Sequence, residues 1–138
     1  MALDSAGSKR IKARGREWEK YVAEFYIDNG FPQAERKRLA GAFDAGDITG
    51  IVGLTVECKN AKVYDVTRWL KQLDVEIVNN GTEYGVLHFK LIRGKAGDHP
   101  VVMRESMWAK ILDIPGVREA MNGIGGTLPS TNNQGDVT

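Results

Sequence analysis

The segment Leu54–Lys59 limits the fold of this chain more than any other feature, because apolar and polar residues alternate strictly along it. Such alternation predicts a β-strand whose neighbouring side chains point to opposite faces of a sheet. Its apolar residues then share one face, and Thr55, Glu57 and Lys59 share the other. A carboxylate and an ammonium group are therefore expected side by side on one face of the sheet.

Amphipathic helices are predicted before and after this strand. The first is expected from about Gly15 to Asn29, with aromatic and apolar residues on one face at helical spacing. The second starts at Asp65, a typical N-cap residue, and carries apolar residues at i, i+3, i+4, i+7 and i+11 before Asn79-Asn80-Gly81 ends it. A last helix over 106–112 is expected to stop before Pro115.

The remaining strands are expected over 33–39, 47–51, 84–92 and 100–103. The order αβββαββα predicts the α/β class, an α+β sandwich with a mixed central β-sheet flanked by helices. At 138 residues the chain suits one domain. We expect a basic N-terminal arm over 1–13, a domain over 14–120 and a flexible, Gly- and Asn-rich C-terminal tail over 121–138.

Composition excludes several classes of protein. Cys58 is the only cysteine, which rules out an internal disulfide framework and a multi-cysteine zinc site. No apolar run is long enough to cross a bilayer, so we expect no membrane association. Together these features predict a cytoplasmic protein.

The charges are clustered although the net charge is only +1. Five cations and no acids occupy 9–16, and a second basic group follows at 36–38. Clustered cations create a positive surface for nucleic acid, although a solvated tail and a solvated loop explain the charge pattern equally well. The predicted DNA-binding residues are Arg10, Lys12, Arg14, Arg16, Arg36, Lys37, Arg38 and Lys62.

A candidate catalytic cluster follows from Asp47 and the strand that carries Glu57 and Lys59. If the strands of Asp47 and Glu57 form a hairpin, two carboxylates converge beside one ammonium group. Hard oxygen ligands of this kind suit Mg²⁺ or Mn²⁺, which can lower the pKa of a bound water and stabilise charge on phosphate. The alternative is an ordinary Glu/Lys pair on an exposed strand.

Gly46-Asp47 and Glu57-Cys58-Lys59 resemble the PD-(D/E)XK motif of restriction-endonuclease-like nucleases. Arg14-Gly15-Arg16-Glu17-Trp18-Glu19, followed by Gly30-Phe31, is similar to the N-terminal pattern of archaeal and phage Holliday junction resolvases. The resemblance implies a restriction-endonuclease-like fold, with Asp47 and Glu57 as metal ligands and Lys59 as the catalytic lysine. It also implies that Glu19 is a further catalytic acid and metal ligand. Gly46 replaces the motif's proline, whose backbone conformation we expect glycine to adopt.

This resemblance implies a Mg²⁺-dependent DNA endonuclease, with Mn²⁺ as a substitute, that resolves Holliday junctions by paired nicks. Branched DNA is then the preferred partner, and two symmetric nicks predict a C₂ homodimer. If the protein is phage-encoded, it acts in the host cell cytoplasm. The alternatives are another PD-(D/E)XK endonuclease, of nicking or restriction type, and a non-catalytic DNA-binding module.

Other residues are assigned structural roles. Glu17 competes with Glu19 but is expected to contact solvent. Gln72 is expected on the surface, although some nucleases of this superfamily place a glutamine on the corresponding helix. His88 is expected on the outward face of its strand, and Cys58 is expected to be a buried thiol that points away from Glu57. The three tryptophans are expected in the core.

Overall fold

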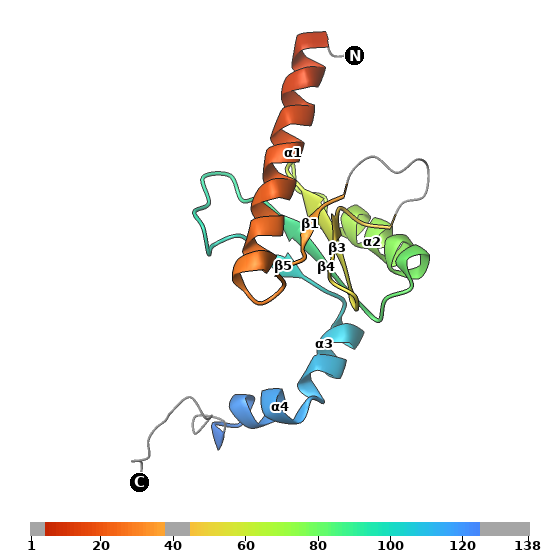
Figure 1. Ribbon diagram of the computed structural model, residues 1–138, viewed down its shortest axis with the longest axis vertical. Helices are drawn as coiled ribbons and strands as arrows, with labels where there is room; N and C mark the ends of the chain where they lie inside the picture. Colours follow the sequence, from red (N-terminus) through yellow and green to blue (C-terminus); the bar gives the residue numbers. More distant parts are fainter. Residues whose placement is uncertain (1–4, 38–44, 125–138) are drawn as a thin grey trace. The chain divides into compact units, whose positions relative to one another are not determined.

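The computed structural model describes residues 5–37 and 45–124. It divides the chain into two compact units, Met1–Met103 and Arg104–Thr138. Figure 1 shows the helices and strands of both units. The sequence predicted a continuous domain over 14–120, between a basic arm and a C-terminal tail. Arg38 and most of the predicted C-terminal tail lie outside the described residues.

A five-stranded mixed sheet forms the centre of the first unit. Its spatial order follows the sequence: β1 (Glu35–Arg36), β2 (Ile48–Thr49), β3 (Leu54–Lys59), β4 (Tyr84–Phe89) and β5 (Val101–Val102). Neighbouring strands are antiparallel except β3 and β4, which are parallel. Parallel neighbours need a crossover connection, which α2 (Val66–Asn80) supplies. The predicted mixed sheet with flanking helices is confirmed.

The ends of α2 lie where the sequence placed them. An Asp65 side-chain oxygen accepts a hydrogen bond from the backbone N–H of Arg68 at 3.3 Å. Gly81 ends the helix in the left-handed conformation, with φ of +71°. Both residues satisfy backbone groups that a helix terminus leaves without a partner.

Helices cover both faces of the sheet, so the strands contribute to two apolar clusters. The cluster on the α1 side contains Trp18, Val22, Ala23, Tyr26, Ala34, Ile48, Ile51, Val56, Cys58 and Val86. The cluster on the α2 side contains Trp69, Leu73, Leu87 and Phe89. Alternation along β3 therefore places Cys58 in the first cluster, as predicted, and directs Glu57 toward α2.

The prediction that His88 faces outward is wrong. His88 is only 4% exposed, because α1 covers this face of β4. Its Nε2 forms a 2.5 Å hydrogen bond with Tyr26 Oη, and Trp18 Nε1 donates to its backbone oxygen at 3.2 Å. The sequence suggested one buried face of β4, whereas the structure buries both.

The first helix, α1 (Ser5–Asp28), begins earlier than the predicted Gly15. Residues 5–13 of the predicted basic arm are therefore helical. Lys, Arg and Ala favour helices, and each interior glycine costs only about 1 kcal/mol relative to alanine. The described residues before Trp18 are not buried, so the first part of the helix presents its charges to solvent.

The described part of the second unit, 104–124, contains two helices rather than the single one predicted, α3 (Glu105–Leu112) and α4 (Pro115–Met121). Pro115 ends the first helical segment but begins the next, because its missing N–H is tolerated in a first turn. No described residue of either helix is buried, and Trp108 is 43% exposed. The prediction that Trp108 belongs to the core is therefore wrong. Within the described ranges, no helix is long and apolar enough to span a bilayer.

Candidate active site

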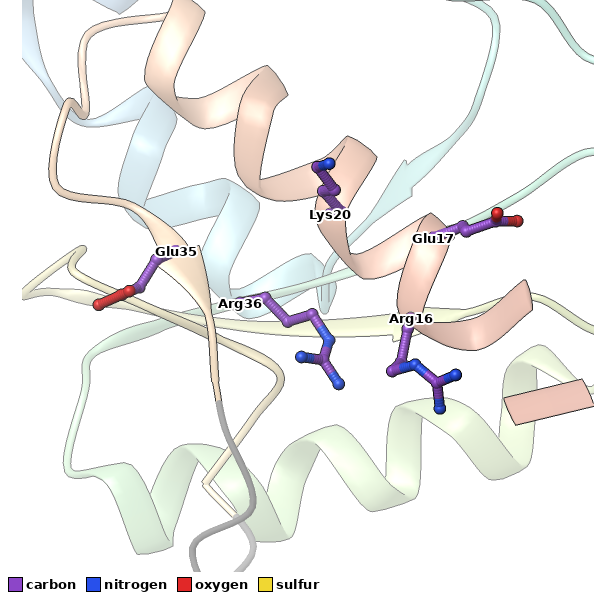
Figure 2. Close-up of a pocket in the computed structure, with 5 residues that line it drawn as sticks. All are labelled: Arg16, Glu17, Lys20, Glu35 and Arg36. Carbon is purple, nitrogen blue, oxygen red and sulfur yellow. The ribbon is translucent and has the colours of Figure 1, made fainter. Parts of the chain in front are cut away.

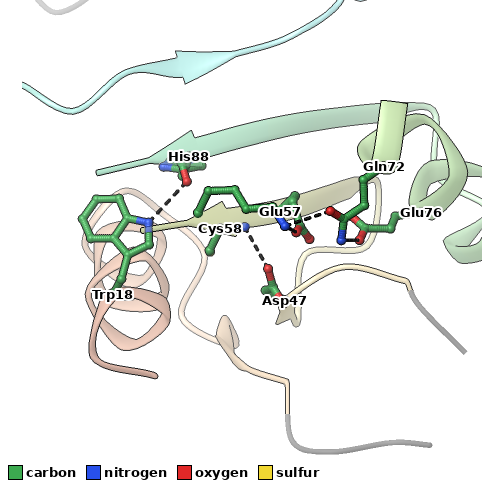
Figure 3. A network of polar contacts seen from close by, with 8 residues as sticks. Trp18, Asp47, Glu57, Cys58, Gln72, Glu76 and His88 are labelled. Atoms are coloured by element: carbon green, nitrogen blue, oxygen red, sulfur yellow. Dashed lines mark hydrogen bonds and ion pairs between the residues drawn. The ribbon is translucent and has the colours of Figure 1, made fainter. Parts of the chain in front are cut away.

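Asp47 directly precedes β2, and the antiparallel pairing of β2 with β3 brings it against β3, the middle strand of the sheet. Ile48 pairs with Val56 in the ladder, and the Asp47 N–H donates to the Val56 oxygen at 2.8 Å. Asp47 Oδ2 accepts from the Cys58 N–H at 2.8 Å, as Figure 3 shows. The predicted hairpin is confirmed. It holds the Asp47 carboxylate against the backbone of the strand that carries Glu57.

Gly46, which precedes this aspartate, has a φ of +99°. Proline is fixed near −65°, so glycine here does not adopt the conformation of the motif's proline, as the sequence had suggested. A Cβ at this position would lie 3.0 Å from the Val56 oxygen and 3.1 Å from Thr55 Cγ2. The turn before Asp47 therefore depends on glycine both for its dihedral angle and for its close approach to β3.

Glu57 is a buried carboxylate, only 3% exposed. Its Oε2 lies 3.1 Å from Lys59 Nζ, whereas its buried Oε1 has no hydrogen-bond partner among the described residues. An unsatisfied carboxylate oxygen away from water is costly, and such groups normally pair or bind a cation. Glu57 and Lys59 thus share the face that the alternation predicted, but this face is covered by α2 and is not an exposed strand.

The acidic side chains influence one another electrostatically. Burial is the main cause that raises the pKa of Glu57, and the Asp47 charge raises it further, followed by contacts with Glu76. Burial also raises the pKa of Glu19, and the Asp47 charge adds to this effect, while Arg36 opposes it. Asp47 therefore lies within electrostatic reach of both glutamates that the sequence singled out.

Glu19 forms an ion pair with Arg36 on β1. Arg36 Nε lies 2.8 Å from Glu19 Oε1, and both side chains are partly exposed. Glu17 is exposed and lines a surface groove of about 370 Å³ together with Arg16, Lys20, Glu35 and Arg36. In Figure 2 the guanidinium groups of Arg16 and Arg36 extend in the same direction.

Gln72 is half-buried, and its side chain contacts Lys59, a contact that the sequence did not predict. Its Oε1 accepts from Lys59 Nζ at 2.8 Å, and its Nε2 donates to Glu76 Oε2 at 3.0 Å (Figure 3). Glu76 is fully buried, at 0% exposed. Sequence analysis did not single out Glu76. Its i+4 spacing from Gln72, beside the apolar stripe of α2, was the available signal.

The donor set fits Mg²⁺ or Mn²⁺ through two carboxylates. Asp47 and Glu57 offer hard oxygen ligands, including the buried Glu57 Oε1 that lacks a described donor. Mg²⁺ usually retains several waters and needs only one or two carboxylates besides phosphate oxygens. In the part of the chain that the structure describes, no three His, Cys, Asp or Glu side chains are grouped to hold an ion. Glu19 as a ligand therefore stays a prediction.

The helical structure of α1 arranges its cations into two rows, because side chains three or four residues apart share a face. The predicted DNA-binding residues Lys12 and Arg16 form one row together with Lys9 and Lys20, and this row leads into the groove that contains Arg36. Arg10 and Arg14 form the other row. The backbone N–H of Lys37 donates to the backbone oxygen of Asp47 at 2.8 Å, which places the Lys37 backbone beside that of Asp47. Lys62 is exposed on the segment after β3.

Comparison with known proteins gives no match to a family model, a curated protein or a solved structure.

Proposed function

We propose that this protein is a Mg²⁺-dependent DNA endonuclease of the restriction-endonuclease-like class that nicks Holliday junctions in pairs. The observation that carries the proposal is the buried Glu57 carboxylate beside Asp47 and Lys59, with Glu57 Oε1 lacking a described donor. Carboxylates that serve only to stabilise a fold are normally satisfied when buried. The element order, the mixed sheet and the motif Gly46-Asp47 with Glu57-Cys58-Lys59 agree with the proposal.

In the proposed reaction, water adds to the phosphorus of a backbone phosphodiester and the P–O3′ bond breaks. The products are a 5′-phosphate and a 3′-hydroxyl, whose oxygen takes up a proton. Asp47 and Glu57 would hold Mg²⁺, which supplies Lewis acidity for the attacking water and for the charged phosphate. Lys59 donates hydrogen bonds toward phosphate oxygens as negative charge develops on them.

The surface around the acidic cluster supports a polyanionic substrate. The row Lys9, Lys12, Arg16 and Lys20 on α1 leads toward Arg36, whose guanidinium contacts Glu19. Contacts of this type neutralise phosphates and set the position of the duplex without reading its sequence. Selection of a four-way junction then depends on DNA shape and on a C₂ dimer that presents two sites.

Cleavage of defined DNA substrates tests the proposal. A synthetic four-way junction is incubated beside linear duplex, flap and single-stranded DNA, with Mg²⁺ and with EDTA. We expect paired nicks in the junction, 5′-phosphate ends and no cleavage in EDTA. Equal cleavage of linear duplex would instead identify a nicking or restriction-type nuclease of the same class. Binding without cleavage in Mg²⁺ and Mn²⁺ would contradict the nuclease proposal and leave the DNA-binding module.

A further inference from the structure

Glu76 occupies a position where an apolar side chain would be expected. It is fully buried on the face of α2 that also carries Trp69 and Leu73, which are 3% and 0% exposed. A buried carboxylate costs stability relative to a leucine in such a place. Packing therefore does not account for a glutamate at position 76.

The hydrogen bonds of Glu76 lead directly to Lys59. Glu76 Oε2 accepts from Gln72 Nε2 at 3.0 Å, and Gln72 Oε1 accepts from Lys59 Nζ at 2.8 Å (Figure 3). Lys59 Nζ also lies 3.1 Å from Glu57 Oε2. The ammonium group thus lies between two oxygens that come from different elements, β3 and α2.

The orientation of the Gln72 amide follows from its neighbours. An ammonium group has only donors, so the amide atom that faces Lys59 must be the oxygen. The amide NH₂ group must then face Glu76, and a carboxyl oxygen accepts from it. A side chain without an acceptor at position 76 would leave this partly buried NH₂ group without that partner and would permit the amide to rotate.

We propose that Glu76 is a positioning residue that fixes the Gln72 amide and thereby holds the Lys59 ammonium group in its catalytic place. A lysine side chain has four flexible methylene groups and loses rotamer entropy when it is fixed. Two acceptors in fixed positions hold the Lys59 ammonium group in place before the substrate binds. Groups that are held in place in advance stabilise developing charge most effectively. The inference rests on the proposed nuclease function for its catalytic consequence, but not for its structural part.

The first test measures the Lys59 amine without DNA or metal. The full chain is treated with a low concentration of acetic anhydride, and acetylation of each lysine is followed by mass spectrometry. Exposed Lys62 and Lys71 serve as internal references. We expect Lys59 to react at least threefold faster in Glu76→Leu than in the wild type, with both references unchanged. Glu76→Gln keeps an acceptor for Gln72 and should leave Lys59 protected.

A swap of the two side chains gives a second test that keeps the composition of the site. Gln72→Leu alone removes the acceptor on α2 that faces Lys59 Nζ and should release Lys59. The double variant Gln72→Glu/Glu76→Gln restores an acceptor for Lys59 and a donor between positions 72 and 76. We expect the double variant to recover the slow acetylation of Lys59. Lys71→Gln, on the exposed side of α2, is the matched control.

The same variants are then assayed on DNA in Mg²⁺. We expect Glu76→Leu to lower kcat at least tenfold with KM changed less than twofold, and Glu76→Gln and the swap to stay within threefold of wild type. Unchanged Lys59 acetylation in Glu76→Leu, or equal damage from Glu76→Gln, would overturn the positioning role. A wild-type protein that does not cleave DNA would overturn the proposed function instead, and the acetylation result would still decide the role of Glu76.

Discussion

On the α1 side of the sheet, buried polar groups are matched to one another. Tyr26 Oη meets His88 Nε2 at 2.5 Å, and Trp18 Nε1 reaches the His88 backbone oxygen at 3.2 Å. On the α2 side, Glu57 and Glu76 are both buried, and Glu57 Oε1 has no donor among the described residues. The first arrangement stabilises the fold, whereas the second costs stability, which is expected where a site must bind a ligand.

Asp47→Asn tests the comparison most strongly. We expect DNA cleavage in Mg²⁺ to fall at least about 1000-fold, or about 4 kcal/mol of transition-state stabilisation. Thermal stability without metal should not fall, because a charge beside Glu57 is removed. His88→Gln should show the opposite pattern, with lower stability and near-normal cleavage by the folded fraction. Full activity of Asp47→Asn, or of the wild type in EDTA, would contradict the assignment of the site.

In mild acid, His88 on the α1 side should lower stability, opposite in sign to the contribution of Glu57 on the α2 side. Burial lowers the pKa of His88 to about 4, so the unfolded chain takes up a proton near pH 6.5 that the folded protein does not. The contribution of neutral His88 is complete above pH 6.5 and is lost as pH falls to 4, by about 2–3 kcal/mol. Urea unfolding of the wild type and of His88→Gln at several pH values isolates this loss as the difference between the two proteins. A His88→Gln variant with the same pH dependence as wild type would contradict it.

Glu19 and Glu17 provide a matched pair on one helix. Glu19 lies in electrostatic reach of Asp47 and contacts Arg36, whereas Glu17 is exposed. We expect Glu19→Gln to slow cleavage at saturating DNA about tenfold, equivalent to about 1.4 kcal/mol, and Glu17→Gln to change it less than twofold. The reverse result would show that the wrong face of α1 was assigned to the site.

Glu57→Gln should remove the stability cost of a buried acid on the α2 side of the sheet. Burial and the Asp47 charge raise the pKa of Glu57, so the folded protein retains a proton that the unfolded chain releases as pH rises above 4.5. The wild type therefore loses stability over this range, and metal-free Glu57→Gln should be more stable at pH 8 by about 1 kcal/mol. The two proteins should be similar at pH 4. Mg²⁺ should stabilise the wild type but not the variant. Identical melting curves at pH 8 would contradict this account.

The two cationic rows of α1 allow a finer comparison. Neutralising Lys12 and Arg16, in the row that leads to Arg36, should reduce the slope of log affinity against log salt by about two, since each phosphate contact contributes about 0.9. Neutralising Arg10 and Arg14 should reduce it by less than one. Equilibrium binding to junction DNA between 50 and 200 mM salt measures both slopes. Equal slopes for the two pairs would show that DNA does not follow the predicted row.

Short-range patterns predicted much of the first unit. The alternation of Leu54–Lys59 predicted β3, and Asp65 and Gly81 marked the ends of α2. The hairpin that brings Asp47 beside Glu57 was only a condition of the predicted site, and the structure contains it. Local signals also predicted helix in α1, but not its start at Ser5, because the basic residues carry no apolar periodicity. The φ of Gly46 likewise depends on the strand packed against it.

The sequence by itself determined which residues form the candidate site: Glu57 and Lys59 alternate on one strand, and Asp47 precedes the neighbouring strand. Only the tertiary structure decided what surrounds them. Burial of His88 requires α1, the Gln72 contact requires the crossover helix, and the Glu19–Arg36 pair joins two separate elements. Such contacts depend on how distant segments pack, and local propensity and periodicity contain no information about that packing.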